Sequence, residues 1–328
     1  MGLTYRDPDV TGPMCMPEAL VSQSPAVSQP YGNGAAADQL TGGGLDDPAR
    51  ARGLGALTQG IYGNDRQVAG QTVGGDTGGL GGFLDSTTRL FDRMSASAEL
   101  RDRFDVVPDD FVGPRLPNQV TASEYDQIVN TYSDIRTGHS NVRFDNSQLS
   151  GDAATNFQGN VMSDLASMMQ TPSGREMING MAYGKNADGS AHAMTIRGIT
   201  NPGGAQAIPG VEANTSNGTG TNTTIEYAPG QSIVNPGKTG VYGSVRSDMT
   251  LYHEMVHAHH MRNGDEDTRT LTAATATDRR DRGLRAWEYQ AMGLGSHAND
   301  PYSENRYRAE RRAMGDTNGT GHWDRYTP

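Results

Sequence analysis

Apolar residues recur at helical spacing along much of the 328-residue chain. The clearest amphipathic stripes predict helices over residues 123–136, 155–169, 175–181, 247–264 and 284–294. A looser pattern predicts a further helix over residues 83–104. Ser247 or Asp248 can cap the start of the helix over residues 247–264, and Gly264 can end it.

Two other segments have the composition of strands. Residues 192–197 alternate weakly between apolar and polar, and residues 223–228 (TTIEYA) are rich in β-branched and aromatic residues. Between them, residues 214–222 (NTSNGTGTN) suggest a mobile hairpin connection. Helices thus surround a small sheet without regular βαβ alternation, which predicts an α+β fold.

Residues 1–82 differ from the rest of the chain. They contain 18 of its 43 glycines and show no sustained hydrophobic period. Such a composition buries too little apolar area to offset the entropy cost of ordering, so we expect disorder. Two interpretations remain open, a flexible linker or a leader for secretion and translocation. We expect one ordered domain over residues 83–328, with a helical lead-in over residues 83–150 and a core over residues 151–328.

Charge and composition exclude several classes of partner. Asp and Glu number 38 against 27 Lys and Arg, for a net charge of −11, which opposes binding to nucleic acid. The sequence lacks both an apolar run long enough to span a membrane and the pattern of an ordinary secretory signal peptide. A single cysteine, Cys15, excludes an internal disulfide bond and a cysteine-based zinc finger.

The segment SDMTLYHEMVHAHHMRNG carries an H-E-x-x-H pattern formed by His253, Glu254 and His257. On a helix, positions i and i+4 lie one above the other, so both imidazoles face one point and can bind zinc. Glu254 can then take a proton from a water bound to that ion and deliver it to the leaving amine. The apolar residues Tyr252 and Val256 supply the opposite face of the helix.

A catalytic zinc site needs a third protein ligand. The metzincin pattern is excluded because His260 and Asn263 stand where it requires Gly and His. The remaining candidate is a glutamate on a later helix. Glu288 lies in the apolar, aromatic stretch LRAWEYQAMGL, and Glu304 and Glu310 in SENRYRAERRAM are alternatives.

Other residues can assist the reaction. Tyr307, Arg308 and Tyr326 lie downstream and are candidates to stabilise the oxyanion of a tetrahedral intermediate. The strand over residues 223–228 can act as an edge strand that pairs with an extended substrate. The polar insert between Gly264 and Gly283 is a candidate flap.

Together the segments HEMVHAHH, AWEYQAMGLG and SENRYRAE resemble the NleD-like zinc metalloproteases delivered by bacterial type III secretion. MSDLASMMQTPSGREMI resembles a helix and T-P-x-G turn of the same family, so the likeness covers roughly residues 156–326. The resemblance implies a zincin-like domain with one Zn²⁺ and an active-site helix. It also implies His253, His257 and Glu288 as ligands and Glu254 as general base. Finally, it implies injection into the host cell cytoplasm, where a characterised relative cleaves mitogen-activated protein kinases.

We therefore expect a type III secreted zinc endopeptidase that hydrolyses a peptide bond in a host protein. We also expect a monomer, with the leader available to a secretion chaperone. Two alternatives remain: a non-catalytic interaction protein with a structural or vestigial histidine cluster, and a zinc hydrolase of a non-peptide substrate.

Overall fold

A computed structural model of the protein describes residues 80–185, 189–201, 204–231, 233–234, 244–317 and 320–322. The chain divides into two compact units, and the described residues from Asp92 onward all belong to one of them. The fold below is that of this unit. Nearly all of the expected leader, residues 1–82, lies outside the described residues, so its disorder stays a prediction. The expected domain boundaries also stay a prediction.

The described part of this unit starts with two helices joined through a pair of short strands. Of α2 (Leu80–Leu100), the residues from Asp92 onward belong to it. The helix expected over residues 83–104 therefore ends at Leu100, and η2 (Arg101–Arg103) and β1 (Asp105–Val107) follow. β1 pairs in parallel with β2 (Gln119–Thr121). α3 (Ala122–Thr137) confirms the helix expected over residues 123–136, and Thr121 and Glu124 form a capping box at its start.

Helices α4 (Gly151–Met169) and α5 (Pro172–Tyr183) meet at the T-P-x-G turn. The Thr171 side chain accepts a hydrogen bond from the Gly174 amide, and proline at the first helical position needs no amide partner. A Cβ atom at Gly174 would lie 2.0 Å from the Met168 carbonyl oxygen, so only glycine fits there. Both helices were expected, but each begins three or four residues earlier than the apolar stripe indicates because their starts are polar.

The central sheet has four strands in the order β3-β4-β6-β5. β3 (Val142–Asp145), β4 (Met194–Gly198) and β6 (Thr223–Tyr227) are parallel, and β5 (Gln206–Pro209) runs antiparallel to β6. β4 and β6 alternate between buried and half-buried residues, as expected of the two strands that the sequence predicts. A separate antiparallel pair consists of β7 (Ile233–Val234) and β8 (Ser244–Val245). The structure thus confirms a mixed helix-and-sheet fold.

The structure corrects two expectations about this sheet. β4 and β6 are parallel neighbours, so the Gly/Asn/Thr-rich segment does not join them as a hairpin. It lies instead in the connection between β5 and β6, and backbone hydrogen bonds from Gly218 to Gly264 and from Thr221 to Met261 hold it. β6 is an inner strand with partners on both sides, so it is not the edge that we expected. Among the described strands, β5 forms that edge.

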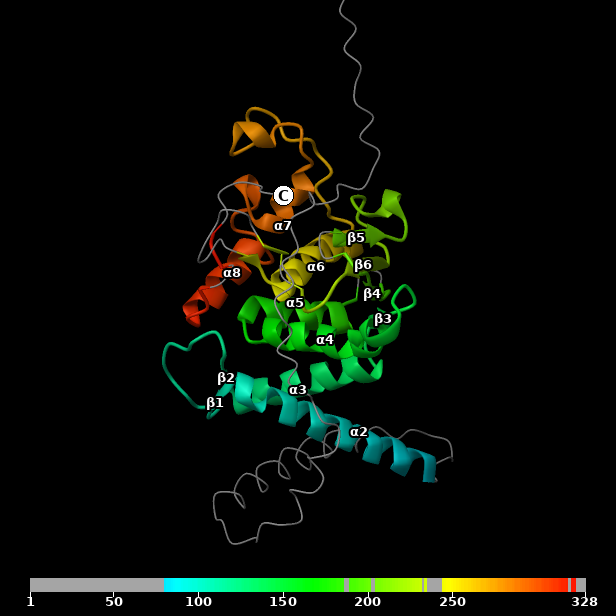
Figure 1. The fold of residues 1–328 in the computed structure, drawn as a ribbon. Helices are drawn as coiled ribbons and strands as arrows, with labels where there is room; N and C mark the ends of the chain where they lie inside the picture. The colour runs from blue at the N-terminus through cyan, green and yellow to red at the C-terminus, as the bar shows by residue number, and fades with distance from the viewer. Residues whose placement is uncertain are drawn as a thin grey trace, which may run out of the picture. The chain divides into compact units, whose positions relative to one another are not determined.

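Helix α6 (Ser247–Asn263) is the centre of the unit (Figure 1). It contacts strands β5 and β6 and helices α4 and α5. It also contacts α7 (Ala286–Met292) and α8 (Glu304–Ala313). Because neighbours surround it, nearly all of its residues are buried, including polar ones. The apolar face containing Tyr252 and Val256 is confirmed as core.

The two ends of α6 differ from each other in how they are capped. Gly264 adopts the left-handed conformation (φ 74°) and donates its amide to the His260 carbonyl, as expected. A Cβ atom there would lie 2.7 Å from the Gly220 and Thr219 nitrogens. At the start, however, the capping position is Arg246, and no side chain caps the helix. Ser247 and Asp248 are already helical, so their expected capping role is wrong.

Methionine is unusually frequent in the core. Ten described methionines are buried: Met162, Met168, Met169, Met177, Met181, Met194, Met249, Met255, Met261 and Met292. Eight of them lie in the main apolar cluster, on α4, α5, α6 and β4, where unbranched side chains can fill irregular space. None of the described helices combines the length and apolar character needed to cross a membrane.

The segment between α6 and α7 forms a small apolar cluster of its own. Leu271 packs with Tyr289 and Met292 of α7 and with Leu294. Backbone hydrogen bonds join Leu271 to Leu284 and Gly283. The polar insert that we expected as a flap is therefore folded against the helix that carries Glu288.

Asp164 of α4 links three elements inside the core. Its carboxylate accepts hydrogen bonds from the Tyr227 hydroxyl at the end of β6 (2.6 Å) and the Ser247 hydroxyl at the start of α6 (2.8 Å). Burial raises the pKa of Asp164 to about 6, and these hydrogen bonds offset burial only in part.

We predict that Asp164 makes folding stability depend on pH. Because its pKa is higher in the folded chain than in the unfolded chain, stability should fall as the pH rises from about 4 to about 6. The shift from 3.8 to about 6 corresponds to about 3 kcal/mol. Asp164→Asn should remove this part of the dependence while keeping an acceptor for Tyr227. Urea unfolding of both chains at pH 4 and pH 7 measures it, and an unchanged difference between them would contradict the prediction.

Candidate metal centre

Two imidazoles from one face of α6 point toward the same space. His253 and His257 are one helical turn apart, and both are buried. Their Nε2 atoms lie 3.1 Å from each other, and the ring planes are nearly perpendicular at a centroid distance of 4.8 Å. The i, i+4 spacing of the motif thus produces the convergence that the sequence indicates.

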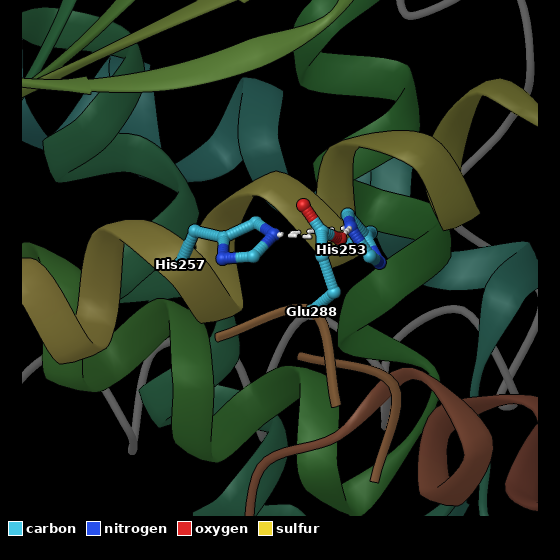
Figure 2. A group of neighbouring side chains, drawn as sticks. All are labelled: His253, His257 and Glu288. Atoms are coloured by element: carbon cyan, nitrogen blue, oxygen red, sulfur yellow. Dashed lines mark hydrogen bonds and ion pairs between the residues drawn. The ribbon is translucent and has the colours of Figure 1, made fainter. Parts of the chain in front are cut away.

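Glu288 of α7 completes the group (Figure 2). Its Oε2 atom lies 3.5 Å from His253 Nε2 and 3.6 Å from His257 Nε2. Figure 2 shows the two rings projecting from one helix and the carboxylate reaching between them from another segment. The three side chains form a group that can hold a metal ion.

The spacing and chemistry of these donors fit a zinc ion. Two ligands each 2.0–2.1 Å from a tetrahedral ion lie about 3.3 Å from each other, close to the three separations here. Within the described part of the chain, the buried Oε2 atom of Glu288 makes no hydrogen bond. A buried carboxylate oxygen needs a partner, and a cation among the three atoms would provide one. Two imidazole nitrogens and one carboxylate oxygen are ligands that zinc prefers.

The charges at this position favour a cation. Burial acts to raise the pKa of Glu288, but the imidazoles of His257 and His253 hold it well below its usual range. Burial acts to lower the pKa of His253, yet contacts with Glu288 and Glu304 raise it well above its ordinary value. The carboxylates of Glu288 and Glu304 therefore favour positive charge at the imidazoles. A proton and a metal ion would compete for the imidazole nitrogens.

Glu254 lies beside the group, on the sheet side of α6. The backbone amide of Ala207, in the edge strand β5, lies close enough to its buried carboxylate to act to lower its pKa. Burial raises the pKa of Glu254, and the neighbouring His253 and His257 offset burial only in part. A carboxyl group with a raised pKa is better suited to exchange a proton near neutral pH.

Glu304 and Glu310, the alternatives to Glu288, both lie elsewhere. Glu304 Oε2 lies 2.8 Å from Nδ1 of His253, the ring nitrogen on the side away from the group. Glu310 accepts hydrogen bonds from the backbone amide and hydroxyl of Ser173 at the start of α5. Neither carboxylate is part of the three-residue group that the structure brings together.

Two of the three expected oxyanion stabilisers, Tyr307 and Arg308, lie in the described part of the chain and contact other residues. Tyr307 is buried, donates its hydroxyl hydrogen to Asp248 (2.6 Å) and stacks on Tyr252. Arg308 is buried and binds Glu304. Both side chains are buried in this structure, and the oxyanion role expected of them stays a prediction. Tyr326 lies outside the described residues, so its role stays a prediction.

Two contacts of the site escaped the sequence analysis. The contact of Ala207 with Glu254 depends on β5, a strand of four residues that gives no clear pattern. The contact of Glu304 with His253 had a usable signal. Ser303 caps α8, and Glu304 and Arg308 are an i, i+4 ion pair, so the sequence carries the marks of a helix starting at Glu304.

Residues 145–320 match the profile of a family described as effector proteins, the M91 peptidases. The chain belongs to this family. It is the NleD-like family that the sequence motifs resemble, so that prediction is confirmed. The matched part of this M91 peptidase contains the whole histidine and glutamate group and the helices that carry it. No match was found among curated proteins. Family membership identifies the chain as a peptidase effector and favours a protease over the non-catalytic alternative.

We predict that zinc stabilises this M91 peptidase through the three-residue group. An ion that binds only the folded state at 100 times its Kd adds about 2.7 kcal/mol, so the unfolding temperature of metal-free chain should rise by several degrees. Glu288→Gln should greatly reduce that rise. His259→Asn is the matched control, because His259 lies on the same helix but contacts Tyr302 and Asn263. An equal rise in the Glu288→Gln variant, measured by calorimetry, would exclude Glu288 as a ligand.

Proposed function

We propose that this chain is a zinc endopeptidase with a zincin-like fold that hydrolyses a peptide bond in a host protein. The observation that carries the proposal is the convergence of His253, His257 and Glu288 on one buried point, with Glu254 beside it. Membership of a peptidase family supports the reaction class. A mixed sheet beside a helix that carries the motif supports the fold.

The residues of this group and Glu254 have different roles in hydrolysis. His253, His257 and Glu288 would hold the metal. Zinc bound there would supply a Lewis acid able to polarise a scissile carbonyl and to lower the pKa of a water molecule. Glu254 accepts the proton of the attacking water and delivers it to the nitrogen of the leaving amine. The raised pKa of Glu254 supports both transfers, since a weakly basic carboxylate would bind the proton too loosely.

The edge strand β5 is the proposed guide for the substrate. β5 pairs with β6 on one side, and its Ala207 amide reaches Glu254. An extended peptide that pairs with the other side of β5 would lie along α6, next to the group of donors. This places on β5 the role that the sequence analysis gave to residues 223–228.

Delivery and target extend the proposal beyond the site. An effector acts on a host protein, and we propose type III secretion as the route into the host cytoplasm, with residues 1–82 as the leader. The resemblance supports a mitogen-activated protein kinase as the substrate. A secretion chaperone on the leader and a monomeric state complete the proposal.

We predict that Glu254→Gln strongly slows hydrolysis while zinc binding and the fold persist. The amide keeps the shape of the side chain but cannot accept the proton, so the rate should fall by about 10²- to 10⁴-fold. Host extract is incubated with the parent or the variant, and new peptide termini are identified by mass spectrometry. Peptide termini that appear only with the parent chain identify the substrate and the cleaved bond.

Zinc content and a thermal unfolding curve of the Glu254→Gln variant serve as controls. Equal cleavage by both chains would refute Glu254 as general base. A chain that binds zinc but produces no new termini in any host extract would support the non-catalytic alternative.

A further inference from the structure

The ring of His253 is held from both sides. Its Nε2 atom faces Glu288 and His257, and its Nδ1 atom lies 2.8 Å from Oε2 of Glu304. Glu304 is the first residue of α8, so a helix remote in sequence reaches the active-site helix through this contact. Both side chains are buried, which excludes water as an alternative partner for most of their surface.

Glu304 is itself held by Arg308, one turn further along α8. Nε of Arg308 donates to Oε1 of Glu304 at 2.6 Å, and a second guanidinium nitrogen contacts the same oxygen. Arg308 is 1% exposed, so its charge is neutralised inside the protein. These two contacts of the guanidinium with Oε1 keep Glu304 in its ionised, carboxylate form.

An ionised carboxylate can only accept hydrogen bonds. The proton of a neutral His253 ring therefore resides on Nδ1, where Glu304 accepts it, and the lone pair is on Nε2, which faces His257 and Glu288. That is the tautomer that binds a metal through Nε2. The alternative tautomer would place two lone-pair acceptors, Nδ1 and Oε2, 2.8 Å apart in the core.

We propose that Glu304, held in place by Arg308, is a positioning residue that fixes the tautomer and orientation of His253 and thereby sets the affinity of the site for zinc. This inference rests on the proposed function, because it assumes that the group binds zinc. It reassigns Glu304 from a candidate ligand to the support of a ligand. Loss of a hydrogen-bond partner of a metal-binding histidine typically lowers metal affinity 10- to 100-fold.

A competing explanation is that Glu304 serves only to neutralise the buried Arg308. Removing Glu304 alone cannot separate the two roles, because taking a carboxylate away from a buried guanidinium destabilises the fold. The double variant Glu304→Leu/Arg308→Met can separate them. It removes both charges, and replacing a buried ion pair by apolar side chains is often neutral for stability. It still leaves Nδ1 of His253 without its acceptor.

The test measures zinc affinity of the full chain by competition with a chromophoric chelator, and thermal unfolding of the metal-free chain. Glu304→Gln should weaken zinc binding about 10-fold and lower the unfolding temperature, because an uncharged amide is a weaker acceptor and removes the carboxylate charge from the contact with the buried Arg308. The double variant should recover the unfolding temperature and bind zinc 10- to 100-fold more weakly than the parent. Glu310→Gln is the matched control on the same helix and should bind zinc as the parent does.

The outcomes separate this inference from the proposed function. A double variant that unfolds like the parent and binds zinc with the parent's affinity would overturn the role of Glu304 alone. If the double variant fails to fold, Glu304→Gln decides the question at a temperature where it is folded, and parental zinc affinity there overturns the inference. A parent chain that binds no zinc would refute the proposed function itself.

Discussion

The buried meeting of two imidazoles and a carboxylate is the interaction on which the rest of this structure depends. Glu288 is an ionised group in the interior, and the interior offers it His253 and His257 in place of water. Taking a carboxylate out of water is costly unless opposite charge is close. Positive charge at this point therefore stabilises the arrangement.

This requirement explains how the surrounding elements are arranged. α6 must be enclosed so that water is excluded from His253 and His257, and the sheet and four helices enclose it. α7 must be held firmly, because it carries Glu288 on only two turns. Tyr289, the next residue, is buried in the second apolar cluster, and its hydroxyl donates to Asp281 (2.7 Å). The insert before α7 thus fixes the helix that supplies the carboxylate.

The sequence predicts the helices of this chain better than its sheet. Helices can be predicted from apolar stripes and from local caps, such as Thr121 and Gly264. Both signals depend on few distant residues. Strands of four residues, such as β3 and β5, carry too few positions for a pattern, and their partners are chosen by tertiary contacts. The parallel pairing of β4 with β6 could not be read from either segment alone.

The same distinction holds for the site. The relation of His253 to His257 lies within one helix, so spacing alone predicts it. Glu288 required a choice among three glutamates. The contact of the Tyr307 hydroxyl with Asp248 joins two helices, so sequence spacing could not predict it.

The methionine-rich core has a chemical consequence. After cysteine, methionine is the side chain that oxidants most readily convert to a polar form. A methionine sulfoxide at Met168, Met194 or Met255 would place a strongly polar oxygen among apolar neighbours. The folded chain shields these sulfur atoms, so reactive oxygen species reach them mainly when the chain opens. The lifetime of the protein in an oxidising environment therefore depends on how often it unfolds. Oxidation of the core methionines during an unfolding event would prevent the chain from refolding.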